Sequence, residues 1–182
     1  MKSYINIANE PASIPLLADD LLEFHAARII LLVYYCGVGK RIGGLTKIAK
    51  LDFFVRYPQF FFDLCKRLGK IVEVNTSTTD STMIRYHYGP WDKRYYHVLP
   101  YLEAKNLLKI SRIKNQFQFQ LTEHGVLAAK ELSEVKEYAP IIDHMKAVKR
   151  ELGNKTGSSL KRMIYEMFED EVAKKPIGTS IK

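Results

Sequence analysis

The segment 107–121 constrains the fold most, because its side chains alternate between apolar and polar over two runs that a short turn joins. A period of two residues is that of a strand with one buried face. The polar pair Lys114-Asn115 lies between the runs, and a two-residue polar turn in that place is typical of a hairpin. The sequence therefore predicts a β-hairpin here. Its alternating apolar positions are Leu108, Ile110, Phe117, Phe119 and Leu121.

Helical patterns lie on both sides of this hairpin. Apolar residues recur at helical spacing over 21–35 and 45–55, and the sequence ends these helices at Gly37 and at Tyr57-Pro58. Asp19 or Asp20 can cap the first helix, and Thr122 can cap a helix that follows the hairpin. A further short helix is predicted over 59–68, and the polar run 75–82 is predicted to be a surface loop.

A third apolar pattern surrounds Gly89-Pro90. The segment 83–88 is rich in β-favouring residues and predicts a short strand. After it we expect a helix with Pro90 in its first turn and with Pro100 kinking or splitting it, because proline cannot donate to the Tyr96 carbonyl. The apolar stripe of this helix is Trp91, Tyr95, Val98 and Leu102.

The resulting order is helix, helix, strand, helix, hairpin, helix, which is that of a winged helix. The fold class is therefore α+β, mainly α. We expect a winged-helix domain over 1–138 with an insert at 58–90, and a C-terminal helical extension over 139–182. Pro140 breaks the helix that follows the hairpin, and 153–157 forms a flexible joint.

The last helix of this extension is expected to begin at a Ser158 or Ser159 cap. One face of it is apolar, which leaves two interpretations open. The face either docks on the chain's own core or binds a partner. Its residues are Leu160, Met163, Ile164, Met167 and Phe168.

Charge is concentrated in the middle of the chain. The 182 residues carry a net charge of +8, and the segment 40–114 holds fifteen bases and six acids. A positive field of this kind attracts nucleic acid or an acidic protein surface. The alternative interpretation of this charge is that the lysines only keep helix faces solvated. The apolar run 29–36 is too short to span a membrane, and Cys36 and Cys65 lack metal-ligand spacing, so a cytoplasmic protein with reduced cysteines is expected.

Catalytic motifs fail on inspection. The segment 37–44 resembles a P-loop, but that loop needs a glycine where this chain has Tyr34 and a hydroxyl residue where it has Arg41. A flexible turn between two helices is predicted here instead. Glu103 and Lys105 match a nuclease-like tripeptide but point to different faces of a helix. The five histidines are scattered. We therefore expect no catalytic residue, no metal and no cofactor.

The most specific stretch of the chain, 89–97, predicts the DNA-contacting residues. If its helix enters a major groove, Lys93, Arg94 and His97 meet phosphates or base edges. The tip of the hairpin would touch the neighbouring backbone through three further residues. These are Arg112, Lys114 and Asn115.

Three stretches carry a family resemblance: Lys50–Pro58, Met83–Tyr95 and Leu121–Gly125. They resemble the middle component of three-component ABC systems, which include the small C subunit of Lamassu-type bacterial defence systems. The resemblance spans roughly residues 24–130, and the block Tyr-Gly-Pro-Trp-Asp is its most specific part. Asn106 stands where such helices more often end in glycine, although asparagine also tolerates the left-handed conformation.

The resemblance implies a non-catalytic accessory subunit of an SMC-like ATPase in anti-phage or anti-plasmid defence. Its implied partners are the ATPase subunit and a nuclease-type effector subunit, which the chain would bridge, with non-specific contact to double-stranded DNA and none to membranes. The alternative is a free-standing winged-helix transcription regulator or antitoxin, with C-terminal helices that form a homodimer. An enzyme of unrecognised type is the third interpretation.

Overall fold

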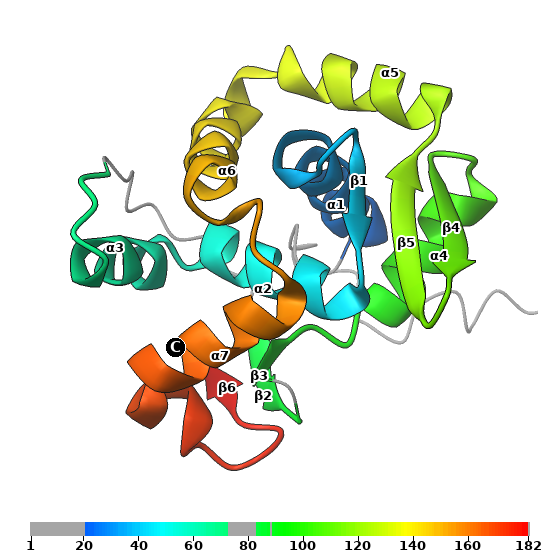
Figure 1. Cartoon of the computed structure of the whole chain (residues 1–182). Coiled ribbons are helices and arrows are strands. Elements are labelled where there is room, and N and C mark those ends of the chain that lie inside the picture. The colour runs from blue at the N-terminus through cyan, green and yellow to red at the C-terminus, as the bar shows by residue number, and fades with distance from the viewer. Residues whose placement is uncertain (1–20, 73–82, 88, 182) are drawn as a thin grey trace, which may run out of the picture.

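The computed structural model describes residues 21–72, 83–87 and 89–181. Helices dominate it, with two small antiparallel sheets beside them, as the predicted α+β class requires (Figure 1). The elements in chain order are α1 (Leu22–Cys36), β1 (Arg41–Gly43), α2 (Leu45–Arg56), α3 (Pro58–Arg67), β2 (Met83–Tyr86), β3 (Gly89–Trp91), α4 (Tyr95–Ala104), β4 (Leu108–Ile113), β5 (Gln116–Leu121), α5 (Glu123–Ser133), η3 (Lys136–Tyr138), α6 (Ala139–Leu152), α7 (Gly157–Met167), η4 (Glu169–Ala173) and β6 (Ser180–Ile181).

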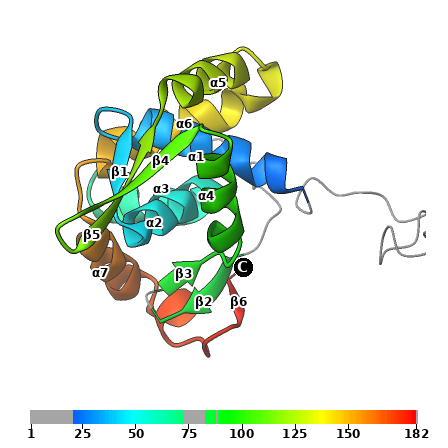
Figure 2. The same ribbon diagram turned by 90° about the vertical axis from the view of Figure 1, so that its right-hand side faces the viewer.

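The first sheet has the strand order β1-β5-β4 and contains the predicted hairpin, which is confirmed. Ile110 pairs with Phe119, and Ile42 of β1 pairs with Phe119 from the other side. The turn at Lys114-Asn115 closes with Lys114 at a φ of 55°. Figure 2 shows the hairpin of β4 and β5 reaching its tip at the left of the view.

Strand β1 lies in the segment that sequence analysis treated as a flexible turn, so that prediction was wrong. The strand is only three residues long, and its pairing partner β5 lies far along the chain. Ile42 is buried in the core, which gives this short segment the nonlocal contact that fixes it. Gly44, with a φ of 85°, then leads into α2.

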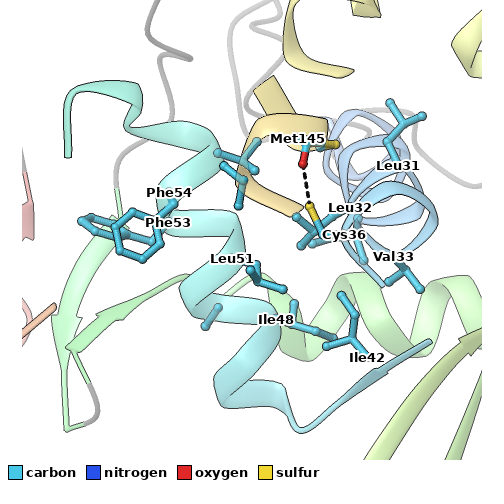
Figure 3. Packing of buried hydrophobic residues seen from close by; sticks show 14 of the residues in the cluster. Leu31, Leu32, Val33, Cys36, Ile42, Ile48, Leu51, Phe53, Phe54 and Met145 are labelled. Atoms are coloured by element: carbon cyan, nitrogen blue, oxygen red, sulfur yellow. Dashed lines mark hydrogen bonds between the residues drawn. The ribbon is translucent and has the colours of Figure 1, made fainter. Parts of the chain in front are cut away.

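One hydrophobic core joins the N-terminal and C-terminal helices. In Figure 1, α5 and α6 lie around α1, and α7 lies beside α2. The close-up in Figure 3 shows α1, α2 and α6 meeting, with the Cys36 Sγ donating to the Met145 carbonyl at 3.4 Å. Because α6 and α7 cover α1 and α2, the C-terminal extension packs within the same core. Cys36 and Cys65 are both free thiols, as expected.

The second sheet, ordered β3-β2-β6, corrects the prediction for 89–94. Pro90 and Trp91 lie in β3, paired with β2, and not in the first turn of a helix. The helix starts only at Tyr95. Gly89 has a φ of 89°, and a methyl group there would lie 3.0 Å from the Tyr165 ring. The tight turn and the close helix α7 therefore favour a strand over a helical start.

Helix α4 runs without a break through Pro100, so it is not split. The carbonyl that proline leaves without a backbone donor belongs to Tyr96. Both Tyr96 and Pro100 are exposed, so water has access to this side of the helix. Asn106, which stands where such helices more often end in glycine, adopts the left-handed conformation with a φ of 54°.

Helix ends follow local signals in part. Thr122 caps α5 as predicted, its Oγ1 accepting from Gly125 N at 3.0 Å. That helix ends at Ser133, before Pro140, which lies in the first turn of α6. The cap of α7 is Thr156 and not a serine, with Ser159 N donating to it at 3.1 Å. The predicted Asp19 or Asp20 cap and the predicted loop 75–82 lie outside the described residues.

Candidate functional site

A buried ionic network lies where α1, α2 and α4 meet. Arg28 Nε donates to Asp52 Oδ1 at 3.0 Å, and the Tyr95 hydroxyl donates to Asp52 Oδ2 at 2.7 Å. Arg56 Nη1 donates to Asp92 Oδ2 at 2.7 Å and lies 3.7 Å from Asp52. All five of these residues are buried. The network therefore links the segment after β3 to both N-terminal helices.

Arg94 extends this network towards the surface. Its guanidinium donates to both oxygens of Asp92, with Nε to Oδ1 at 2.9 Å and Nη2 to Oδ2 at 2.8 Å. Its Nη1 lies 2.9 Å from Nε2 of the buried His25, whose Nδ1 lies 3.0 Å from Arg28. The side chain of Arg94 is 29% exposed. Arg94, which the sequence predicted to contact DNA, is paired with Asp92 in the structure.

The charges of the network hold its members ionised. Burial opposes ionisation of Asp92, but hydrogen bonds from Arg94 and the charge of Arg56 outweigh it and lower the pKa of Asp92 to about 2. Burial alone would lower the pKa of Arg56, yet Asp52, Tyr95 and Asp92 raise it above its ordinary value. A carboxylate that stays charged between guanidinium groups binds them strongly and is ill suited to accept a proton at neutral pH. The network is therefore suited to fixing the angles between helices.

The other residues predicted to contact DNA are exposed. Lys93 lies just before α4 and His97 lies in its first turn, while Arg112, Lys114 and Asn115 lie at the tip of the hairpin. These predicted DNA-contacting residues therefore lie in two separate groups, one at α4 and one on the hairpin.

The outward side of α4 itself carries little positive charge. Its exposed residues are Tyr96, His97, Pro100, Glu103 and Ala104. Glu103 Oε1 accepts a hydrogen bond from Ile110 N on β4 at 2.9 Å. The glutamate of the nuclease-like tripeptide therefore holds the helix against the sheet. Lys93 before the helix and Lys105 after it are the nearest exposed bases.

The apolar face of α7 lies largely inside the chain. Leu160, Ile164 and Phe168 are buried, and Met163 and Met167 pack against the same core while half-buried. The Phe168 ring lies 4.8 Å from that of Phe60 on α3. Of the two interpretations left open by the sequence, the structure corresponds to docking on the chain's own core.

An apolar groove that sequence analysis missed lies between α1, α4 and α5. Its volume is about 360 Å³. Val135 is 41% exposed at its edge, and Glu23 and Glu131 are exposed on its rim. The sequence signal for this groove is the apolar Val135 just beyond the end of α5. A single apolar residue does not locate a groove. The remaining lining residues are Ala26, Ala27, Ile30, Tyr101, Leu107, Ala128 and Leu132.

A buried lysine also escaped sequence analysis. Lys50 is fully buried on α2, and its Nζ donates to the Pro90 carbonyl at 2.8 Å. Burial, with a smaller effect from the charge of Lys161, lowers the pKa of Lys50 to about 7. The sequence signal was present, since Lys50, Asp52 and Arg56 are the only polar residues in the segment 48–56.

Among the described residues, no group of three or more histidine, cysteine or acidic side chains is placed to hold a metal ion. The same part of the chain contains no helix with the length and apolar character needed to cross a membrane. Comparison with protein-family models, curated proteins and solved structures found no match to this chain.

Proposed function

We propose that this chain is a non-catalytic winged-helix subunit of a bacterial SMC-like ATPase defence complex, where it bridges the ATPase and its effector and contacts DNA. The winged-helix assignment is supported by the order α1, β1, α2, α4, β4, β5, in which α3, β2 and β3 are inserted after α2, and by the sheet ordered β1-β5-β4. A short first strand beside a C-terminal hairpin, packed on three helices, is the arrangement expected of a winged helix. The subunit role itself rests on the family resemblance of the three stretches quoted above.

Two observations favour an assembly role over a free-standing regulator. A promoter reader needs basic or amide side chains on the outward side of its reading helix, and α4 presents Tyr96, His97 and Pro100 there while Asp92 holds Arg94. The regulator alternative also uses the C-terminal helices for a homodimer. Those helices bury their apolar faces against α1 and α2.

The groove between α1, α4 and α5 is the protein-docking surface of this proposal. Its walls are apolar and its rim carries Glu23 and Glu131. An amphipathic helix of the ATPase with basic residues beside its apolar stripe matches both features, since a helix in a groove is held by apolar anchors and opposite charges guide its approach.

Co-purification tests the proposal. The tagged chain is expressed together with the products of its neighbouring genes, among which the proposal requires an ATPase and an effector. It is expressed as wild type, as Val135→Asp and as Val38→Asp. Val38 is a matched control, since it is 52% exposed and lies outside the groove. We expect wild type and V38D to retain the ATPase and V135D to lose most of it, because the new carboxylate would be buried against the apolar anchors of the partner helix.

Two results would overturn the proposal. Recovery of the wild-type chain as a lone homodimer that binds one palindrome would favour the regulator. Equal retention of the ATPase by V135D and V38D would remove the groove from the interface.

A further inference from the structure

The sheet ordered β1-β5-β4 has a strongly basic character. Its three strands and the hairpin turn contain no aspartate or glutamate. They contain four bases, all exposed: Arg41, Lys109, Arg112 and Lys114.

Strand register places two of these bases in one row on the outer face. Arg41 pairs with Gln120, and Gln120 pairs with Lys109. All three side chains are exposed. Their neighbours on each strand, Ile42 and Phe119, are buried. Because side chains alternate between the faces of a strand, the row points away from the core.

The next row of the outer face is polar, and an exposed apolar side chain, Ile113, lies beyond it at the tip. Gln118 lies between Gly43 and Ser111 in the next row, and Gln116 pairs with Ile113 at the tip. A hollow of about 440 Å³ lies here, lined in part by Gly43, Lys114 and Asn115.

Two glycines make room for Gln116. A methyl group at Gly44 would lie 2.7 Å from Gln116 Nε2, and one at Gly43 would lie 3.5 Å from it. Because these two glycines have no side chain, the Gln116 amide can lie against the sheet beside the hollow.

We infer that this outer face binds the phosphodiester backbone of duplex DNA. The inference rests on the DNA contact of the proposed function and moves the main contact from α4 to the strands. Lysine, arginine and glutamine are among the side chains that contact phosphate oxygens, and the face carries Arg41, Lys109 and Lys114 beside three glutamines.

The spacing of the bases suits a duplex groove. Arg41 and Lys109 lie on strands separated by β5, which places their backbones about 10 Å apart. Lys114 lies five residues beyond Lys109, or about 17 Å along the strand direction. A major groove is about 12 Å wide between its phosphate strands, so these charges can reach both of its edges.

An acidic protein surface fits this face less well. The centre of a protein interface is apolar and depleted of charge, whereas the centre of this face consists of Gln118, Gln120 and Ser111. Interfaces with DNA are polar and strongly positive. Charge and polarity therefore both favour the nucleic acid.

The test compares two triple variants of the full chain that lose the same net charge. R41Q/K109Q/K114Q neutralises the outer face and the hairpin tip. K146Q/R162Q/K174Q neutralises three exposed bases on α6, α7 and the segment after η4. Fluorescence anisotropy measures binding to a labelled random-sequence duplex at salt concentrations from about 50 to 200 mM.

We expect the slope of log K against log salt, which is negative, to become shallower by about 2.7 in the sheet variant, because each lost phosphate contact removes about 0.9 from its magnitude. Its affinity at about 0.1 M salt should fall at least tenfold, while the control stays within about twofold of wild type. Its circular dichroism spectrum and its retention of the ATPase should match those of wild type, which separates lost DNA contact from misfolding.

Equal losses in both triple variants would overturn the inference, since net charge alone would then explain binding. A wild-type chain that ignores the duplex but binds polyglutamate, with the same loss in the sheet variant, would assign the face to an acidic protein. A wild-type chain that binds neither would remove the DNA contact altogether, while retention of the ATPase would still support the subunit role.

Discussion

Removal of the buried amine of Lys50 should change how stability depends on pH. Its pKa is about 7 in the folded chain and about 10.4 in an unfolded one. Between these values the unfolded chain binds more protons, so unfolding takes up a proton and the free energy of unfolding rises with pH. Below pH 6 both states are charged, and the contribution of Lys50 becomes flat.

The size of the effect follows from the two pKa values. The slope is about 0.7 kcal/mol per pH unit at pH 7, where half of the folded molecules are protonated at Lys50, and about 1.3 near pH 9. Integrated from pH 7 to 9, the gain in stability is about 2 kcal/mol. Burial of the Nζ beside the Pro90 carbonyl is the physical source of this gain.

Urea unfolding at several pH values measures it, with wild type, Lys50→Met and Lys130→Met compared. Other groups also change their protonation on unfolding in this range. One is Cys65, whose pKa burial raises to about 11 in the folded chain, against about 8.5 in an unfolded one. Subtracting the K50M curve from the wild-type curve cancels groups that do not interact with Lys50. Lys130 is exposed on α5, so K130M should keep the wild-type slope. If K50M and wild type show parallel curves, the amine does not lose its proton on folding and the reasoning fails.

Three further outcomes can be measured. Asp52→Asn should lower the free energy of unfolding by about 3–5 kcal/mol, because it leaves buried guanidinium groups without their carboxylate, while Asp143→Asn, an exposed change, should cost under about 0.5. Thr122→Ala should cost about 1 kcal/mol by loss of its cap, and unchanged urea midpoints would contradict this. Cys36 and Cys65, both buried with raised pKa values, should resist Ellman's reagent until urea unfolds the chain; fast labelling of the native chain would contradict their burial.

The sequence predicted those elements whose signals are local. The hairpin followed from alternation around Lys114, and the start of α5 followed from the Thr122 cap. Strand β1 could not be predicted, because a three-residue strand is fixed by partners on β5 that lie far along the chain. The same reason explains Trp91, whose β-pairing with Ile84 outweighed a helical pattern.

The candidate site was predicted less well than the fold. An exposed arginine and one held by a carboxylate look alike in a sequence, so Arg94 was assigned to DNA although Asp92 lies two residues away. Apolar spacing marked Leu160 and Ile164 as a buried face but could not say which surface covers it. The outer face of the first sheet required the register that places Arg41 and Lys109 on either side of Gln120, which no local pattern contains.

The N-terminal helices α1 and α2 pack against helices that the ribosome makes last, α6 and α7. Helix α1 is apolar on nearly all sides from Ile29 to Val33, and its cover includes α6, while α7 covers α2. A ribosome that adds about 5–20 residues per second needs roughly 5–20 s to pass from Arg56 to Met167. During this time the nascent chain presents an apolar helix to its surroundings. Chaperones that hold unfolded chains should therefore bind it before the last two helices emerge.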